Sequence, residues 1–103
     1  MSEYSSDLST WQGIRKWYLD LKAAGDAFGL AMLQNRGPDI TYHSDEFLEL
    51  VSMFEDRNGR EDPKLLVAAN DFLFSWEDYP KRMKAIDTIA SRVAYHLKKA
   101  RET

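Results

Sequence analysis

Cysteine is absent from this 103-residue sequence, which excludes both a disulfide framework and a thiolate metal site. Proline and glycine are scarce, with three and five residues, which disfavours an all-β fold with its many tight turns. No apolar run reaches the roughly 20 residues that a membrane span needs. The polar start, M-S-E-Y-S-S-D, lacks the basic and apolar regions of a signal peptide. We therefore expect a cytoplasmic protein.

The composition that remains is that of one globular domain. Hydrophobic residues make up 44% of the chain and aromatic residues 13%, which is enough for a core. Charged residues make up 30%, with both signs mixed along the chain, which argues against disorder. A chain of this length suits a single domain. We expect residues 1–7 to form a flexible N-terminus and residues 8–103 to form a single helical domain.

One stretch, Ala23–Leu33, is almost entirely apolar and rich in small residues. Asp26 is its one polar residue, and six of its residues are alanine or glycine. A soluble helix that is apolar nearly all round must be buried nearly all round, so we expect the other helices to pack around this segment. Gly25 then marks a close helix contact or, alternatively, a kink. Asp26 is expected at the rim of the core; a structural pairing with a cation and a catalytic acid are the alternatives.

Apolar residues spaced three and four positions apart predict long helices at both ends of the domain. The first is expected over residues 8–36, with Asp7 or Ser9 as its N-cap, and the last over residues 80–101. Both carry a heptad seam, which in the last helix runs through Met83, Ile86, Ala90, Val93, Leu97 and Ala100. The two seams predict that these helices pack along each other. The first helix also has a second apolar stripe on its other side, formed by Leu19, Ala23, Leu30 and Leu33.

Two shorter helices are expected between the long ones. After a connector at residues 39–43, Ser44 or Asp45 caps a second helix, which ends at 57–59. Asp62 and Pro63 supply an N-cap and a first-turn proline for a third helix. The predicted fold is therefore all-α, a compact four-helix bundle with long first and last helices and a short central helical hairpin.

Charge is spread unevenly along this chain of net charge −3. Residues 36–62 hold three basic and eight acidic residues, a net −5, whereas residues 80–103 hold seven basic and two acidic residues, a net +5. The favoured interpretation is complementarity between the middle helices and the last helix inside the fold. The alternative is a pair of opposite surface patches for partners.

Catalytic and metal-binding motifs are missing. His43 is followed by Asp45 and Glu46, but this spacing does not match a metal-binding motif on one helix face such as H-E-x-x-H. The sequence also contains no G-x-S-x-G nucleophile elbow and no phosphate-binding loop. Arg92 and His96 lie closer together than the Arg…His pair of small helical ribonuclease domains, so His96 is interpreted as a residue at the boundary of the core. We expect no catalytic residue, no cofactor and no metal, and hence not an enzyme.

Two surfaces are candidates for binding a partner. On the third helix, Val67 and Phe74 lie opposite the core face within an acidic rim, which resembles a small interface patch. The alternative is that both side chains tuck under residues 36–43 or against the first helix. The predicted partner-binding residues are Val67, Phe74, Asp71 and Asp78. The possible nucleic-acid face lies on the last helix and consists of Lys84, Arg92, Tyr95 and Lys99.

These features favour a small helical protein that acts by binding another protein, as an adaptor, an inhibitor or an immunity-type regulator. Its surplus of apolar surface predicts a homo-oligomer, in particular a homodimer. The alternative is a nucleic-acid-binding regulator that uses the basic face of the last helix. An isoelectric point of about 5.3 makes nucleic acid the less favoured partner.

Overall fold

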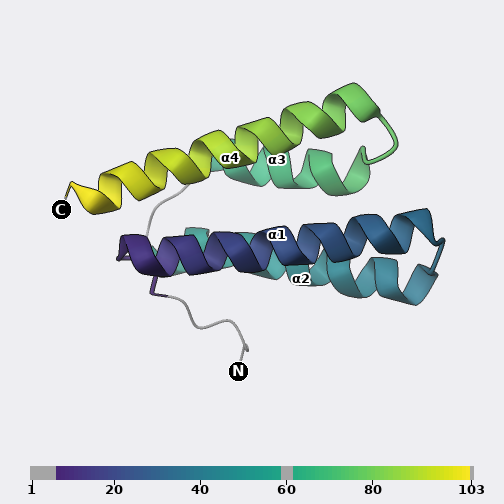
Figure 1. The fold of residues 1–103 in the computed structure, drawn as a ribbon, viewed down its shortest axis with the longest axis horizontal. Helices are drawn as coiled ribbons and strands as arrows, with labels where there is room; N and C mark the ends of the chain where they lie inside the picture. Colours follow the sequence, from purple (N-terminus) through teal and green to yellow (C-terminus); the bar gives the residue numbers. More distant parts are fainter. Residues whose placement is uncertain (1–6, 59–61, 103) are drawn as a thin grey trace.

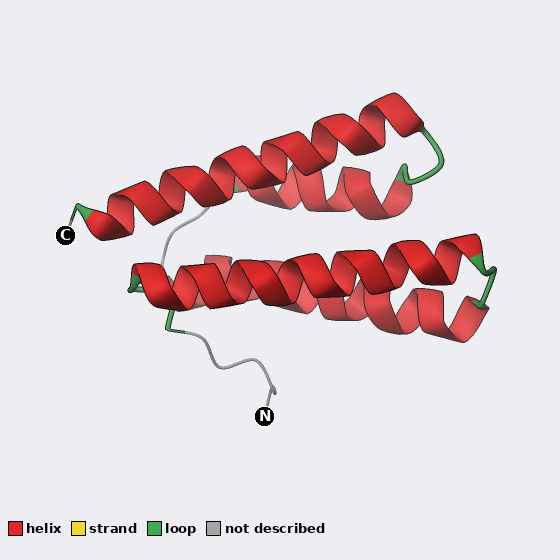
Figure 2. Cartoon of the chain, viewed as in Figure 1, coloured by secondary structure: helices red, strands yellow, loops and turns green. Residues whose placement is uncertain are grey.

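Four α-helices follow one another along the part of the chain that this computed structural model describes, residues 7–58 and 62–102. They are α1 (Trp11–Leu33), α2 (Gly37–Asn58), α3 (Pro63–Phe74) and α4 (Tyr79–Arg101). Loops of a few residues join α1 to α2 and α3 to α4 (Figure 2). The fold is the all-α four-helix bundle that the apolar spacing predicts.

The bundle consists of two antiparallel hairpins laid side by side (Figure 1). α1 packs on α2 and α3 packs on α4, while α4 also contacts α1 and α2 also contacts α3. The predicted contact between the first and last helices is therefore present. α1 and α3 occupy opposite corners of the bundle, so each helix has two neighbours and an outward face.

The start of α1 differs from the prediction because a turn precedes it. Thr10, rather than Asp7 or Ser9, is the N-cap, and its side chain accepts the backbone N–H of Gly13 at 3.1 Å. The Asp7 carboxylate instead accepts the backbone N–H and the hydroxyl of Ser9, at 3.0 and 2.6 Å. Leu8, inside this turn, is buried in the core. Apart from Asp7, the predicted flexible N-terminus lies outside the described residues.

The predicted connector over residues 39–43 is wrong, because these residues belong to α2. Pro38 lies in the first turn of α2, where a proline sacrifices no helical hydrogen bond and its fixed φ suits the helix. α1 ends at Leu33, and Asn35 rather than Gly37 adopts the left-handed conformation between the helices, with φ 55°. α2 is consequently as long as α1, and only α3, with 12 residues, is short.

The expectation that the stretch from Ala23 to Leu33 is buried nearly all round is also wrong. Its core-facing half packs inward through four residues: Ala24, Gly25, Phe28 and Ala31. Ala23, Leu30 and Leu33 are exposed, because α1 has neighbours only on the α2 and α4 sides. Asp26 is exposed as well, which confirms its predicted place at the rim.

The buried face of α4 is rotated relative to its predicted seam. Met83, Ile86 and Ala90, which the heptad pattern assigns to the core, are exposed. The buried residues of this helix are Ala85, Ile89, Val93, His96 and Ala100. The reason is that α4 packs most extensively on α3, its hairpin partner, and less on α1. An apolar stripe alone does not show which of two neighbours a helix will favour.

Gly25 allows the two hairpins to close around an aromatic cluster. The rings of Phe47 and Phe72 stack with centroids 5.2 Å apart. A Cβ atom on Gly25 would lie 3.3 Å from the Phe47 ring and 3.6 Å from the Phe72 ring, which leaves no room for a larger side chain. α1 continues as one helix through this position. The predicted close contact at Gly25 is confirmed.

We expect opposite effects from substitutions at Gly25 and Gly29 of α1. Gly25→Leu forces a branched side chain against two packed rings and should lower the free energy of unfolding by about 1–3 kcal/mol. At Gly29 a Cβ atom meets only the edge of Trp76 at 3.7 Å, an ordinary contact. Gly29→Ala should raise the free energy of unfolding by up to about 1 kcal/mol through helix propensity. Urea unfolding of both variants checks this, and a Gly25→Leu protein as stable as the parent would contradict the packing described.

Candidate functional site

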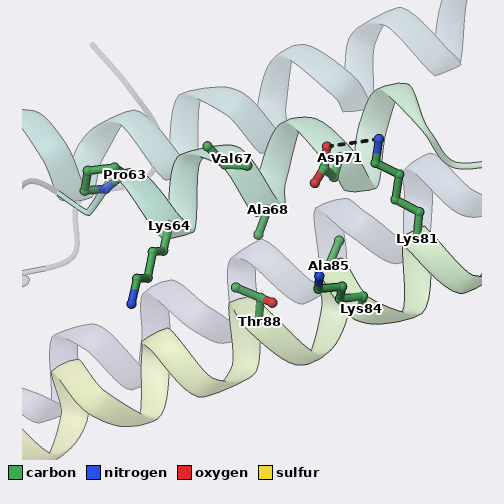
Figure 3. A pocket seen from close by; sticks show the side chains of 9 residues that line it. All are labelled: Pro63, Lys64, Val67, Ala68, Asp71, Lys81, Lys84, Ala85 and Thr88. Atoms are coloured by element: carbon green, nitrogen blue, oxygen red, sulfur yellow. Dashed lines mark ion pairs between the residues drawn. The ribbon is translucent and has the colours of Figure 1, made fainter.

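A groove of about 400 Å³ lies between α3 and α4 (Figure 3). Its floor contains two alanines, Ala68 and Ala85, which are buried where the helices face each other. Because a methyl group fills so little of the space between two helices, the surface stays hollow above them. The lining residues are Pro63, Lys64, Val67, Ala68 and Asp71 from α3 and Lys81, Lys84, Ala85 and Thr88 from α4.

Lysine side chains from both helices surround the groove. Lys64 comes from α3, and Lys81 and Lys84 come from α4 (Figure 3). Asp71 is the one acidic residue of the lining, and its Oδ1 lies 3.9 Å from the Nζ of Lys81. Within the described residues neither Lys64 nor Lys84 makes an ion pair. The groove therefore carries an excess of positive charge that the fold does not neutralise.

The predicted interface pair, Val67 and Phe74, lies on the outward face of α3. Val67 is 60% exposed and lines the groove, while Phe74 is 72% exposed at the last residue of the helix. Both side chains are exposed, so neither tucks under residues 36–43 or against α1. Two acidic residues are also predicted to bind the partner. Asp71 lies in the groove, whereas Asp78 is the N-cap of α4 and accepts the N–H of Lys81 at 3.2 Å.

The predicted nucleic-acid face does not form one uniform surface. Lys84 lines the groove, whereas the guanidinium of Arg92 is directed at a buried carboxylate, that of Asp62. The ring of Tyr95 lies between two cations, with Arg92 Cζ at 4.5 Å and Lys99 Nζ at 5.3 Å from its centroid. The cations of this face thus interact mainly with groups of the protein itself.

A buried acidic residue, Asp62, fixes one end of the α3–α4 hairpin. As the N-cap of α3, it accepts the backbone N–H of Leu65 at 3.1 Å. Its Oδ2 also accepts hydrogen bonds from Arg92 Nε at 2.8 Å and from His96 Nε2 at 2.7 Å. The side chain of Asp62 is only 3% exposed. These bonds join the start of α3 to α4 across 30 and 34 positions of sequence.

The hydrogen bonds keep Asp62 ionised. Burial by itself raises the pKa of this carboxyl group, but the hydrogen bonds from Arg92, His96 and the Leu65 N–H, with the positive charge of Arg92, outweigh it and leave the pKa below its usual value. Facing an ionised carboxylate, the Nε2 of His96 carries the hydrogen of that bond. His96 is buried, so its interpretation as a boundary residue is wrong.

The other end of the hairpin is held by Arg82 of α4. Its Nη1 donates to the backbone carbonyl of Trp76 at 3.0 Å, and its guanidinium carbon lies 4.2 Å from the centre of the Trp76 ring. Trp76 belongs to the turn that follows α3. With Asp62 at one end and Arg82 at the other, both ends of the short α3 helix are bonded to α4. The groove between them is therefore a preformed feature of the surface.

The sequence predicts Asp62 as a helix cap but does not predict its contact with α4. The signal is an arginine and a histidine four residues apart, Arg92 and His96, which lie on one face of a helix. Nothing local shows that this face meets a helix start 30 residues earlier. The favoured idea of charge complementarity inside the fold holds at Asp62. Among the described side chains no ion pair joins an acidic residue of α2 to α4, and these two helices meet through aromatic rings, with the centroids of Phe54 and His96 4.6 Å apart.

Other kinds of site are not found in the described part of the chain. His43 bonds Glu46 one helical turn away, with Nδ1 and Oε1 3.2 Å apart. Residues 7–58 and 62–102 contain no group of three or more His, Asp or Glu side chains placed to hold a metal ion, and no helix among them is long and apolar enough to cross a membrane. Comparisons of the chain with protein-family models, with curated proteins and with solved structures find no match.

Replacing Asp62 should separate its roles as a cap and as an ion-pair partner. Asp62→Ala removes both and leaves Arg92 and His96 without their acceptor, which should cost about 2–4 kcal/mol. Asp62→Asn keeps a good N-cap and loses only the charge, so a smaller loss of about 1–2 kcal/mol is expected. Urea unfolding at neutral pH measures both. No loss of stability for Asp62→Asn would show that the ion pairs with α4 contribute nothing, and the loss for Asp62→Ala would then measure the cap alone.

Acid should remove the contribution of Asp62 to stability. The pKa of Asp62 is lower in the folded chain than in the unfolded chain. Its ion pairs therefore stabilise the fold fully above the unfolded value of about 3.9 and are lost as the pH falls through the lower folded value. The difference in unfolding free energy between the parent and Asp62→Asn should shrink as the pH falls below about 4. A difference that is unchanged at low pH would contradict an ionised Asp62.

Proposed function

We propose that the protein acts by binding another protein through the groove between α3 and α4 and the exposed apolar residues beside it. The observation that carries this proposal is the combination of an alanine floor, a lysine rim and the exposed side chains of Val67 and Phe74 on one face. An apolar centre surrounded by charged residues is the usual anatomy of a protein interface. Phe74, exposed at the end of α3, offers the large aromatic anchor that such interfaces favour.

The charges of the groove favour an acidic partner. Three lysines against Asp71 leave a net positive rim, with the excess charge on the α4 wall, which complements carboxylates placed beside apolar side chains. A groove between two antiparallel helices runs along their axes, and an amphipathic helix fits such a groove with its apolar face down. We therefore assign the partner segment to an acidic amphipathic helix. In this role the protein is an adaptor or inhibitor that carries out no chemical step itself.

Nucleic acid is the less supported partner. Val67 and Phe74 offer apolar area that phosphate groups do not use. The ring of Tyr95 lies between Arg92 and Lys99 and is therefore less available to stack on a base. The exposed acidic residues of α2, among them Asp45 and Glu49, would repel a long polyanion that extends beyond the groove.

A library of displayed helical peptides with randomised surface residues tests this proposal without knowledge of the natural partner. Selection on the folded protein should enrich peptides that combine carboxylates with leucine or phenylalanine at helical spacing. Binding of the selected peptides should fall about tenfold or more in Lys84→Glu and in Phe74→Asp, since each removes a central contact. Lys98→Glu is the matched control on α4, because Lys98 lies outside the groove, and it should bind normally.

Circular dichroism of the same variants shows whether the fold is kept, as expected for these exposed positions. Three results would overturn the proposal. They are enrichment of basic or uncharged peptides, equal losses in Lys84→Glu and Lys98→Glu, and tighter binding to a duplex DNA or a single-stranded RNA oligomer than to any selected peptide. The last result would instead support the nucleic-acid alternative.

A further inference from the structure

The outward face of α1 carries a stripe that is apolar except at Asp26 and that no other described element covers. Its residues recur at steps of four and three positions, which places them in line along the helix and opposite its core face. Leu19, Leu30 and Leu33 are 54%, 51% and 76% exposed. The stripe consists of Leu19, Ala23, Asp26, Leu30 and Leu33. The four apolar residues of this stripe are predicted from the sequence, but they are expected to be covered within the bundle.

We propose that this α1 stripe pairs with the same stripe of a second copy of the chain, with the two α1 helices antiparallel about a two-fold axis. An antiparallel pairing centred between Ala23 and Asp26 places Leu19 of each copy beside Leu30 of the other. Ala23 then lies next to the axis, where a small side chain lets the two helices approach closely. Such an isologous contact closes on itself and gives a dimer rather than a filament.

The charges beside the stripe select the antiparallel direction. Lys22 and Asp26 are exposed one helical turn apart, and neither makes an ion pair within the described residues. In a parallel pairing Asp26, which lies within the stripe, would face Asp26 of the other copy, which is repulsive. In the antiparallel pairing Lys22 of each copy faces Asp26 of the other, so two symmetric ion pairs form at the centre.

The dimer leaves the proposed partner site open. α1 and α3 occupy opposite corners of the bundle, so the α1 stripe and Phe74 lie on different faces. A dimer would thus present two grooves and bind a partner with two acidic helices more tightly than a single copy does. That consequence rests on the proposed function, whereas the dimer itself does not.

Sedimentation equilibrium of the parent and of charge-exchange variants tests the proposal. The parent should be a dimer at high micromolar concentration. Leu19→Gln combined with Leu30→Gln should weaken dimerisation about tenfold or more while keeping the helix content. Lys22→Asp alone and Asp26→Lys alone should each weaken it, because like charges then meet. The double variant Lys22→Asp, Asp26→Lys should restore it, because the ion pairs re-form with their signs exchanged.

Phe74→Asp is the matched control, since it alters the partner face and should leave the dimer intact. A parent that stays monomeric at these concentrations would overturn the proposal. So would a dimer that Phe74→Asp abolishes and the leucine substitutions do not, because this result would place the contact on α3. Failure of the double variant to recover would exclude the antiparallel pairing. Peptide binding to the groove is measured separately, so the two proposals can fail independently.

Discussion

The carboxylate of Asp62 is the interaction on which the second half of the molecule depends. This carboxylate caps α3 and accepts hydrogen bonds from Arg92 and His96 of α4. α3 has only 12 residues, a length at which an isolated helix is marginal in water. Its stability must therefore come from packing against its neighbours and from bonds at its ends. A buried carboxylate is costly unless it is fully bonded, and here three donors meet that requirement.

This connection also shapes the surface. Asp62 and Arg82 hold the two ends of the α3–α4 hairpin. Between them the helices pack through two small residues, Ala68 and Ala85, and the space above these alanines remains open as the groove. Because each helix of the bundle has two neighbours, apolar residues placed opposite the core remain in contact with water. α1 and α3 both carry such residues, at opposite corners of the bundle. The fold thus offers one outward face to a partner and another to a second copy.

Periodicity and capping signals predict much of the fold. The four helices, the cap at Asp62, the close contact at Gly25 and the outward position of Val67 and Phe74 all follow from local spacing. The connector at residues 39–43 is predicted wrongly, because a proline near a helix start can equally well begin the next helix. The seam of α4 is predicted wrongly because the choice between α1 and α3 as its main neighbour is a property of the whole bundle.

The candidate site is less accessible from sequence than the fold. Val67, Asp71 and Lys84 can each be proposed as surface residues, but the groove exists only because Ala68 and Ala85 meet across two helices. The triad of Asp62, Arg92 and His96 joins residues 30 and 34 positions apart, and no local rule brings them together. Such long-range pairings follow from the packing of the hairpins and are visible only in the folded chain.

Native-state hydrogen exchange in the Asp62→Asn variant tests the central claim most directly, because it reports stability helix by helix. If Asp62 holds α3 against α4, the amides of α3 should lose much more protection than those of α1 and α2, with the asparagine still capping the helix. An equal loss of protection in all four helices, or no loss in α3, would contradict the account.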